Sequence, residues 1–468
     1  MMSSAMAENF IENHTYDEIR VGESASLTRI LRPEDIQLFA IMSGDVNPAH
    51  VDPEYAHSSM FHEVIAHGMW GGALISTVLG TEFPGPGTIY VTQTLKFSRP
   101  VKVGDTVTIK ITCKQKFDHN KHILFDCLCT NQDGLKVISG EAEVLAPTEK
   151  IKRARMELPE VTISDREARY RRLIARAKGL APAKAVFAYP AHAESLRSAT
   201  VARDAGLLQP ILVGPEALVR RVAEQSGVDL RECQIVDAPH GKAAIARAVA
   251  MARAQEAEIL VQGALPTHDF LLPLIAHDGL RTERRLSHVL YIDVPGHPRP
   301  IIISDMMVNI EPTLEDKVDI TQNAIDFAHI MGIPDPKVAV LAAIETVTPK
   351  MRATVDAAAL CKMADRGQIT GGALDGPLGF DNAVSLIAAR TAHLKSAVAG
   401  QADVLIAPDL EAGNMLAKQL EHLSDAISGG VVLGGRVPIV LANRSDSVES
   451  RVASLVLAQL VAHARRAA

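Results

Sequence analysis

The pattern of apolar residues changes once along this 468-residue chain, and that change restricts the folds open to it. Up to about residue 146, short segments rich in β-branched residues follow one another across turns such as Asn131-Gln-Asp-Gly134. From Lys184 onward, apolar strands alternate with helical segments instead. Hairpin-connected strands form an antiparallel sheet, whereas strand–helix alternation forms a parallel one. Together with the length, the change predicts two or three domains.

The first part of the chain predicts an antiparallel sheet curled around one helix. We expect its strands at residues 88–97, 106–116, 123–130 and 136–145. Residues 67–80 are apolar nearly all round and end at Gly80, as a buried helix with a glycine cap does. Such a helix needs cover on most of its sides. An α+β hotdog domain over residues 16–147 provides that cover.

The second part of the chain predicts an α/β fold. Its strands are expected at residues 185–188, 210–213, 258–261, 301–304, 338–342, 404–407 and 437–442. Between the two parts, residues 148–165 are typical of a charged linker, with Pro147 and Pro159 near its ends. Residues 166–468 are many for one sheet, so we expect two α/β lobes with parallel sheets and a ligand cleft between them.

Composition narrows the functional classes. Hydrophobic residues make up 47% of the chain and charged residues 22%, which is the balance of a globular protein. The net charge of -7 offers no basic surface for a phosphate backbone, so nucleic acid is not expected as a partner. The five cysteines show neither disulfide nor metal-ligand spacing, and no signal peptide or membrane span is recognisable. We therefore expect a cytoplasmic protein.

A first group of polar residues follows a short helix that starts at Pro33 and closes at Gly44. Asp45 and His50 come directly after it and can both reach one small volume, as addition of water to a double bond requires. Gly68 opens the apolar helix, whose free N–H groups suit a thioester oxygen that becomes an enolate. The competing interpretation is structural: Asp45 accepts loop N–H groups and the histidine only packs. The grouping of these residues favours catalysis.

These residues also resemble a known family. Ser43-Gly-Asp-x-Asn-Pro-x-His50, Ile65-Ala-His-Gly-Met69 and Phe97-Ser-Arg-Pro-Val-Lys-Val-Gly-Asp105 are similar to motifs of the MaoC-type (R)-specific enoyl-CoA hydratases. The likeness covers most of residues 16–146.

The resemblance implies a role for each residue of the motif. Asp45 activates water, His50 shares in proton transfer, and the Gly68 N–H holds the thioester carbonyl. Asn47 and Ser76 are expected near the substrate. Three other polar residues are expected to be structural, as a turn, a helix cap and a supporting contact: Ser43, Asp52 and His67.

A second group of polar residues, Asn443, Arg444 and Ser445, stands between an apolar strand and the amphipathic helix at residues 448–465. Backbone amides at a helix start bind phosphate well, and the arginine adds a planar pair of donors. The chain has no P-loop or dinucleotide fingerprint, so ATP and NAD are not expected. Asp446 is a candidate base, but with Glu449 it also fits a capping box, and both interpretations stay open.

This part resembles the phosphate acetyl/butyryltransferases from about Glu167 to the C-terminus. The motifs are Leu374-Asp-Gly-Pro-Leu, Ala402-Asp-Val-Leu-Ile-Ala-Pro, Leu410-Glu-Ala-Gly-Asn414 and Pro438-Ile-Val-Leu-Ala-Asn-Arg-Ser-Asp-Ser447. The resemblance implies reversible acyl exchange between coenzyme A and inorganic phosphate, without metal, bound cofactor or covalent intermediate.

In that exchange Arg444 stabilises the negative centre, and Arg281 and Arg284 are further candidate phosphate contacts. Two positions depart from the family pattern, which commonly has serine at Asn443 and, in acetyl-type members, aspartate at Ser450. The base of this half is therefore open.

Both halves would handle short acyl thioesters of coenzyme A, so the sequence predicts a bifunctional enzyme, a hydratase fused to an acyltransferase. We expect a homodimer or a higher homo-oligomer that binds acyl-CoA and acyl phosphate and no membrane. Two alternatives stay open. In one, the hydratase is active and the second half is a regulatory or dimer-forming domain. In the other, both pockets only sense acyl-CoA.

Overall fold

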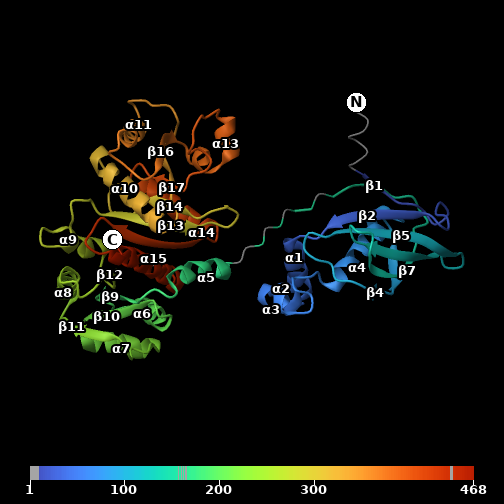
Figure 1. Ribbon diagram of the computed structural model, residues 1–468, viewed down its shortest axis with the longest axis horizontal. Coiled ribbons are helices and arrows are strands. Elements are labelled where there is room, and N and C mark those ends of the chain that lie inside the picture. The colour runs from blue at the N-terminus through green and yellow to red at the C-terminus, as the bar shows by residue number, and fades with distance from the viewer. Residues whose placement is uncertain are drawn as a thin grey trace. The chain divides into compact units, whose positions relative to one another are not determined.

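The computed structural model describes residues 10–156, 158, 159, 161, 163, 166–442 and 446–467 (Figure 1). Its internal contacts divide the chain into two units, Met1–Ile163 and Ser164–Ala468. The division lies inside the segment that the sequence predicts as a linker. The beginning of that segment forms β8 (Lys152–Ala154), which pairs with β1 (Phe10–Glu12) in a small antiparallel sheet of the first unit.

The main sheet of the first unit is antiparallel and contains all four predicted strand segments. Its strand order is β2 (Ser24–Ile30), β5 (Thr106–Phe117), β6 (His122–Thr130), β7 (Lys136–Leu145) and β3 (Ile89–Gln93), and β4 (Lys96–Phe97) also pairs with β7. The predicted strand at 88–97 is thus interrupted between β3 and β4. Gly140 on β7 lets the chain between β3 and β4 pass close to β7, because a Cβ at residue 140 would lie 1.8 Å from the Thr94 carbonyl oxygen.

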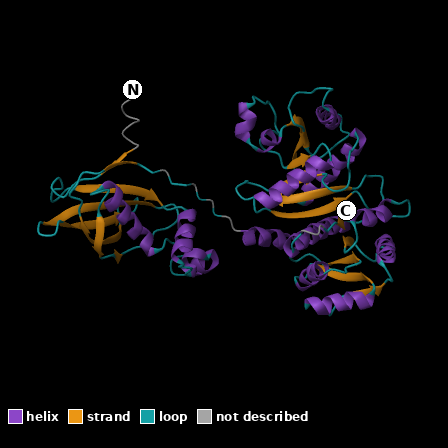
Figure 2. Ribbon diagram, turned by 180° about the vertical axis from the view of Figure 1, so that it is seen from behind, coloured by secondary structure: helices purple, strands orange, loops and turns teal. Residues whose placement is uncertain are grey.

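The buried helix of the first unit, α4 (Gly68–Thr77), lies against this sheet (Figure 2). Trp70 and Ile75 join a core with the inward-facing residues of β5, β6 and β7. The helix does not end at Gly80 as the sequence predicts but continues as a π-helical turn, Val78–Glu82. Val78 and Leu79 are fully buried in this turn, so their burial outweighs the stop signal of the glycine. Pro84 follows and cannot continue a helix.

Three short helices precede α4: α1 (Pro33–Ser43), α2 (Pro48–Val51) and α3 (Pro53–Ser58). Each has Pro at its start, where the missing N–H costs nothing. α1 ends as predicted at Gly44, whose φ of 75° is left-handed. Asp52 caps α3 by accepting the N–H groups of Glu54 and Tyr55. These caps set the path of the chain between Gly44 and α4.

The second unit is built on one sheet of eleven strands. Their order is β11 (Gln234–Asp237), β10 (Leu208–Gly214), β9 (Ala183–Ala188), β12 (Ile259–Gln262), β19 (Ile439–Val440), β18 (Ile427–Leu433), β13 (Ser287–Asp293), β14 (Ile301–Ser304), β17 (Val404–Ile406), β15 (Lys337–Leu341) and β16 (Ala373–Leu378). The five strands from β11 to β19 are parallel to one another, and so are the four from β14 to β16. These two groups are the predicted lobes, so the α/β fold class is confirmed.

The two parallel groups are joined by β13 and β18, which are antiparallel to each other and to their outer neighbours. The sheet is therefore mixed rather than parallel throughout. β18 contains Gly429 and Gly430 in mid-strand, which weakens its strand signal. Gly430 makes room for His288 on β13, because a Cβ there would lie 2.3 Å from His288 Nε2.

Helices cover both lobes (Figure 1). They are α5 (Arg166–Ala177), α6 (Ala193–Asp204), α7 (Glu216–Ser226), α8 (Gly241–Arg253), α9 (Thr267–Ile275), α10 (Leu314–Ile330), α11 (Arg352–Asp365), α12 (Phe380–Val384), α13 (Leu386–Thr391), α14 (Leu410–Leu423) and α15 (Val448–Ala467). The last of these, α15, packs on β18 and against α5 and α6. In the described part of the chain, no helix is both long and apolar enough to cross a bilayer.

Candidate active sites

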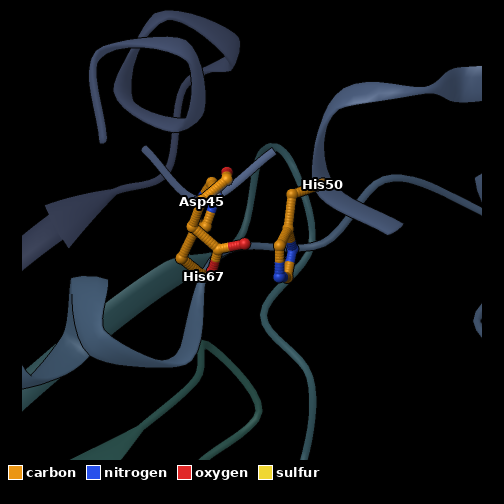
Figure 3. A group of neighbouring side chains, drawn as sticks. All are labelled: Asp45, His50 and His67. Carbon is orange, nitrogen blue, oxygen red and sulfur yellow. Dashed lines mark hydrogen bonds between the residues drawn. The ribbon is translucent and has the colours of Figure 1, made fainter. Parts of the chain in front are cut away.

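Asp45, His50 and His67 form one group in the first unit (Figure 3). A carboxylate oxygen and one nitrogen from each imidazole all lie within 4.8 Å of one another. Asp45 follows the left-handed Gly44, His50 lies on α2, and His67 is the residue before α4. Asp45 and His50 thus lie together, as their spacing predicts, and His67 joins them from the start of α4.

Asp45 is held by its own loop. Its N–H donates to Ser43 Oγ at 3.2 Å, and its Oδ1 accepts the Asn47 N–H at 3.2 Å. The structural interpretation of Asp45 as an acceptor of loop N–H groups is therefore correct for one oxygen. The residue is nevertheless exposed, and Figure 3 shows its carboxylate facing the His50 ring. The second oxygen remains available for chemistry.

Hydrogen bonds to the backbone fix the tautomers of both histidines. His50 Nδ1 lies 2.9 Å from the Ile65 carbonyl oxygen, so this nitrogen carries the proton and Nε2 keeps a lone pair. His67 Nε2 lies 3.0 Å from the Asp45 main-chain oxygen, so here Nε2 carries the proton and Nδ1 keeps the lone pair. The two rings lie 4.1 Å apart at 35°. His67 is buried, and its Nδ1 has no hydrogen-bond partner among the described residues.

The start of α4 lies beside this group. His67 is the N-cap of α4, but its side chain makes no capping bond, so the N-cap side chain leaves the first amides of the helix unsatisfied. Gly68 allows the Phe97 ring to pack closely on the start of α4, since a Cβ at residue 68 would lie 3.1 Å from that ring. Free amides at a helix N-terminus stabilise negative charge that develops on a thioester oxygen.

The two residues expected near the substrate, Asn47 and Ser76, are not members of the group of Asp45, His50 and His67. Asn47 Oδ1 accepts the Ala49 N–H at 3.1 Å, so this oxygen caps α2. Ser76 is exposed on α4, eight residues beyond Gly68, which corresponds to about 12 Å along the helix axis. Within one chain, the structure does not bring Ser76 to the Asp45 carboxylate.

In the second unit, the predicted phosphate residues Asn443, Arg444 and Ser445 lie outside the described residues. Asp446 comes next, and its main-chain oxygen accepts Arg451 Nε at 3.4 Å. Ser447 Oγ accepts the Ser450 N–H at 3.2 Å, which is an N-cap bond at the start of α15. This serine therefore makes the capping bond that the sequence offers to Asp446.

Arg281 and Arg284 lie at the other end of α15. Arg284 forms an ion pair with Asp326 of α10 and lines a cavity of about 450 Å³ together with Arg465. Arg281 pairs through its backbone with Gly435, beside that same cavity. α15 is about 30 Å long, so its ends are well separated. Within one chain, the two arginines are thus remote from Asp446, at the opposite end of the helix from the expected phosphate junction.

The structure shows notable contacts for two residues that the sequence did not select as candidates, one in the group of Asp45 and His50 and one in the second unit. His67, expected to be structural, belongs to the group of Asp45 and His50. Glu345, in the loop after β15, accepts Asn382 Nδ2 at 2.6 Å and the Gly379 N–H at 3.1 Å. The hydrogen bond from Asn382 holds the pKa of Glu345 below its usual range. No spacing in the sequence signals this contact, because it depends on β15 and β16 being neighbours.

Comparison with known proteins assigns the second unit. A family model described as "Phosphate acetyl/butaryl transferase" matches residues 240–459. The phosphate acetyltransferase of Rhizobium meliloti is 52% identical over 302 residues, which cover 64% of this chain and 96% of that protein. The chain belongs to the phosphate acetyl/butyryltransferase family.

A second family model, described as "MaoC like domain", matches residues 14–127 of this family member. The predicted fusion of a MaoC-like domain with a phosphate acetyl/butyryltransferase domain is therefore confirmed. The branched-chain phosphotransacylase of Enterococcus faecalis V583 is 28% identical, with a TM-score of 0.53 over 59% of this chain and 99% of that one. R-Hydratase PhaJ1 of Pseudomonas aeruginosa is 44% identical over 33% of this chain and 99% of that one, with a TM-score of 0.32.

Proposed function

We propose that this phosphate acetyl/butyryltransferase is bifunctional. Its first unit hydrates trans-2-enoyl-CoA to (R)-3-hydroxyacyl-CoA, and its second unit exchanges an acyl group between coenzyme A and phosphate. The convergence of Asp45 and His50 beside the free amides at the start of α4 carries the hydratase half. The 52% identity to a phosphate acetyltransferase supports the transferase half.

In the hydration, one water molecule lies between the free oxygen of Asp45 and Nε2 of His50. The carboxylate takes a proton from the water as the oxygen adds to C3 of the enoyl chain. The electron pair of the double bond moves toward the thioester oxygen, where the Gly68 N–H stabilises it. The site then returns the proton to C2, so the protein ends in the protonation state in which it began.

In the acyl transfer, the coenzyme A thiol loses its proton and attacks the carbonyl carbon of an acyl phosphate. A bond forms between the sulfur and the carbonyl carbon, the bond between that carbon and the bridging phosphate oxygen breaks, and phosphate leaves. Arg444, Asn443 and Ser445, which precede α15 in the sequence, are the proposed ligands of the phosphoryl oxygens. Asp446, the first described residue after Ser445, is the proposed base.

A homodimer or higher assembly fits the uncovered surface of the first unit. The edge strand β3 exposes Ile89, Tyr90 and Val91, and α4 exposes Met69. An edge strand with exposed apolar residues is prone to pair with another chain, and here we propose a second copy. Sedimentation of the full chain tests the assembly, and a monomer at micromolar concentration would contradict it.

Two assays on the purified full chain test the function. Crotonyl-CoA is offered for hydration, and acetyl phosphate with coenzyme A is offered for thioester formation, each with acyl chains of graded length. Both activities are expected. Hydration alone would favour a regulatory second unit, and binding of acyl-CoA without either reaction would favour a sensor.

A further inference from the structure

We propose that Asp45, His50 and His67 bind one divalent transition-metal ion, Zn²⁺ above all, and that this ion blocks hydration. The metal site rests on the geometry alone, whereas the block rests on the proposed hydratase function. Nothing in the hydration itself requires a metal, so the ion acts as an inhibitor.

The donor set suits Zn²⁺. Two imidazole nitrogens and one carboxylate oxygen are a common ligand set for this ion, and a water molecule completes four-coordination. Bonds of about 2.1 Å place tetrahedral ligand atoms about 3.4 Å apart. The three donor atoms here lie within 4.8 Å of one another, so they need to close by at most about 1.4 Å. Asp45 is exposed and His67 buried, so the carboxylate can move toward a fixed imidazole.

Both imidazoles are already oriented for coordination. Metal-binding histidines usually donate their other N–H to a carbonyl or carboxylate, which fixes the ring and the tautomer. His50 donates from Nδ1 to the Ile65 oxygen, and His67 donates from Nε2 to the Asp45 main-chain oxygen. Each ring therefore keeps one nitrogen with a lone pair that no described residue uses. At His67 that nitrogen is buried without a partner, which is unfavourable unless a ligand occupies the site.

The three cysteines of the same unit are buried and do not compete for the ion, and burial raises the pKa of the first of them, Cys113. Cys127 and Cys129 lie on β6 in the core, and burial raises the pKa of their thiols to about 12 and about 11. A thiol binds Zn²⁺ as the thiolate, which these buried groups do not supply near neutral pH. The ion is thus directed to the nitrogen and oxygen donors of the catalytic group.

A metal ion in this position stops hydration for a direct reason. It takes the lone pair of His50 and the free oxygen of Asp45, which are the two acceptors that hold and deprotonate the water. The acyl-transfer site belongs to the second unit, separate from the metal site in the first unit, so acyl transfer continues when the ion is bound.

Binding is measured first, by calorimetric titration of the metal-free full chain with Zn²⁺ and by the absorption spectrum of the Co²⁺ form. We expect one ion per chain from this site and at least tenfold weaker binding for His67→Gln. His57→Gln is the matched control, because His57 also bonds a backbone carbonyl through Nδ1 and lies outside the group. Its affinity should equal that of the wild type.

The variant Asp45→Asn/His50→Gln/His67→Gln defines the background from all other residues. Fluorescence of Trp70, the single tryptophan, verifies that the first unit of this variant is folded. Wild-type binding no tighter than that background would overturn the metal site.

Inhibition is measured on the same samples. Added Zn²⁺ should abolish crotonyl-CoA hydration in competition with the substrate, EDTA should restore it, and acyl transfer should stay unchanged. Hydration that rises with Zn²⁺, or that persists at saturating Zn²⁺, would overturn the inhibition. A chain that binds Zn²⁺ but never hydrates would retain the metal site and refute the proposed hydratase, so the two failures are distinguishable.

Discussion

The two candidate sites of this chain are built in opposite ways. In the first unit, three residues between positions 45 and 67 converge within 4.8 Å. In the second unit, the expected contacts extend from Arg281 to Asp446 and lie at opposite ends of α15. Asp45, His50 and Asp446 were selected from the sequence by the same reasoning about helix starts and polar loops. Arg281 and Arg284 were candidates from the family resemblance, and His67 was expected to be structural. The difference lies in what positions them.

The first site is positioned by local turns. Gly44 ends α1, Asn47 caps α2 and Asp52 caps α3, so hydrogen bonds over two or three residues determine where Asp45 and His50 lie. The second site depends on which strands are neighbours in an eleven-stranded sheet. Local sequence shows turns and helix caps directly, but it shows only weakly which strands are neighbours. The predictions below test this contrast.

The largest effect is expected at Asp45. Asp45→Ala removes the acceptor that deprotonates water, so hydration should fall by at least about 10³-fold. Acyl transfer should be unchanged, because Asp45 belongs to the other unit. Steady-state rates of both reactions on one preparation provide the measurement. Loss of both activities together would contradict independent sites.

The next effect is expected at Arg444. Arg444→Ala removes a charged donor from the phosphoryl group, and phosphate use should fall by roughly 10²–10³-fold. Hydration should be unchanged in the same preparation. The measurement is kcat/KM for phosphate with saturating acyl-CoA. Unchanged phosphate kinetics would refute the assignment of this junction.

Strand positions were predictable because each strand carries its own apolar run. The sequence located β9, β10, β12, β14, β15, β17 and β19 in the second unit and β5, β6 and β7 in the first. It did not locate β13 and β18, which join the two lobes. Gly429 and Gly430 interrupt the apolar run of β18. Gly430 leaves space for His288 on β13, and this contact depends on which strands are neighbours, which the local sequence does not show.

The same limit applies to the sites. The pairing of Asp45 with His50 was predictable from spacing, while the membership of His67 was not, because it depends on how the chain returns to α4. Likewise, Arg284 lies near Gly434, which follows β18, whereas β19 leads to the start of α15. Because β18 and β19 are antiparallel, these two points lie at opposite edges of the sheet, and the local sequence does not reveal this direction.

A smaller effect concerns the stability of the second unit in acid. Burial lowers the pKa of His288, at the junction of the lobes, to about 3. Below pH 6.5 the histidine is protonated in the unfolded chain but stays neutral in the folded unit, so protonation favours unfolding. The free energy of unfolding is therefore highest above pH 6.5 and decreases as the pH falls from 6.5 toward 3. At pH 5 the loss is about 2 kcal/mol in the free energy of unfolding.

Urea unfolding of wild type and His288→Leu at pH 7 and pH 5 measures this loss. The wild type should lose about 2 kcal/mol more than the variant, even if leucine changes stability uniformly. Far-UV circular dichroism reports the unfolding of both units, and fluorescence of Trp70, the single tryptophan, reports the first unit alone. The part of the circular dichroism transition that the fluorescence does not share therefore belongs to the second unit. Equal pH dependence in the two proteins would contradict the buried neutral histidine.

The smallest effect is expected at Arg284, and it tests the contrast most sharply. Its ion pair with Asp326 is exposed, with 43% and 44% of the two side chains accessible, so its contribution is at most ~1 kcal/mol. Arg284→Ala should change kcat/KM for phosphate by less than about fivefold. Asp326→Ala is the matched control. A hundredfold loss in Arg284→Ala alone would mean that a second copy of the chain completes the phosphate site, because α15 separates Arg284 from Asp446 within one chain.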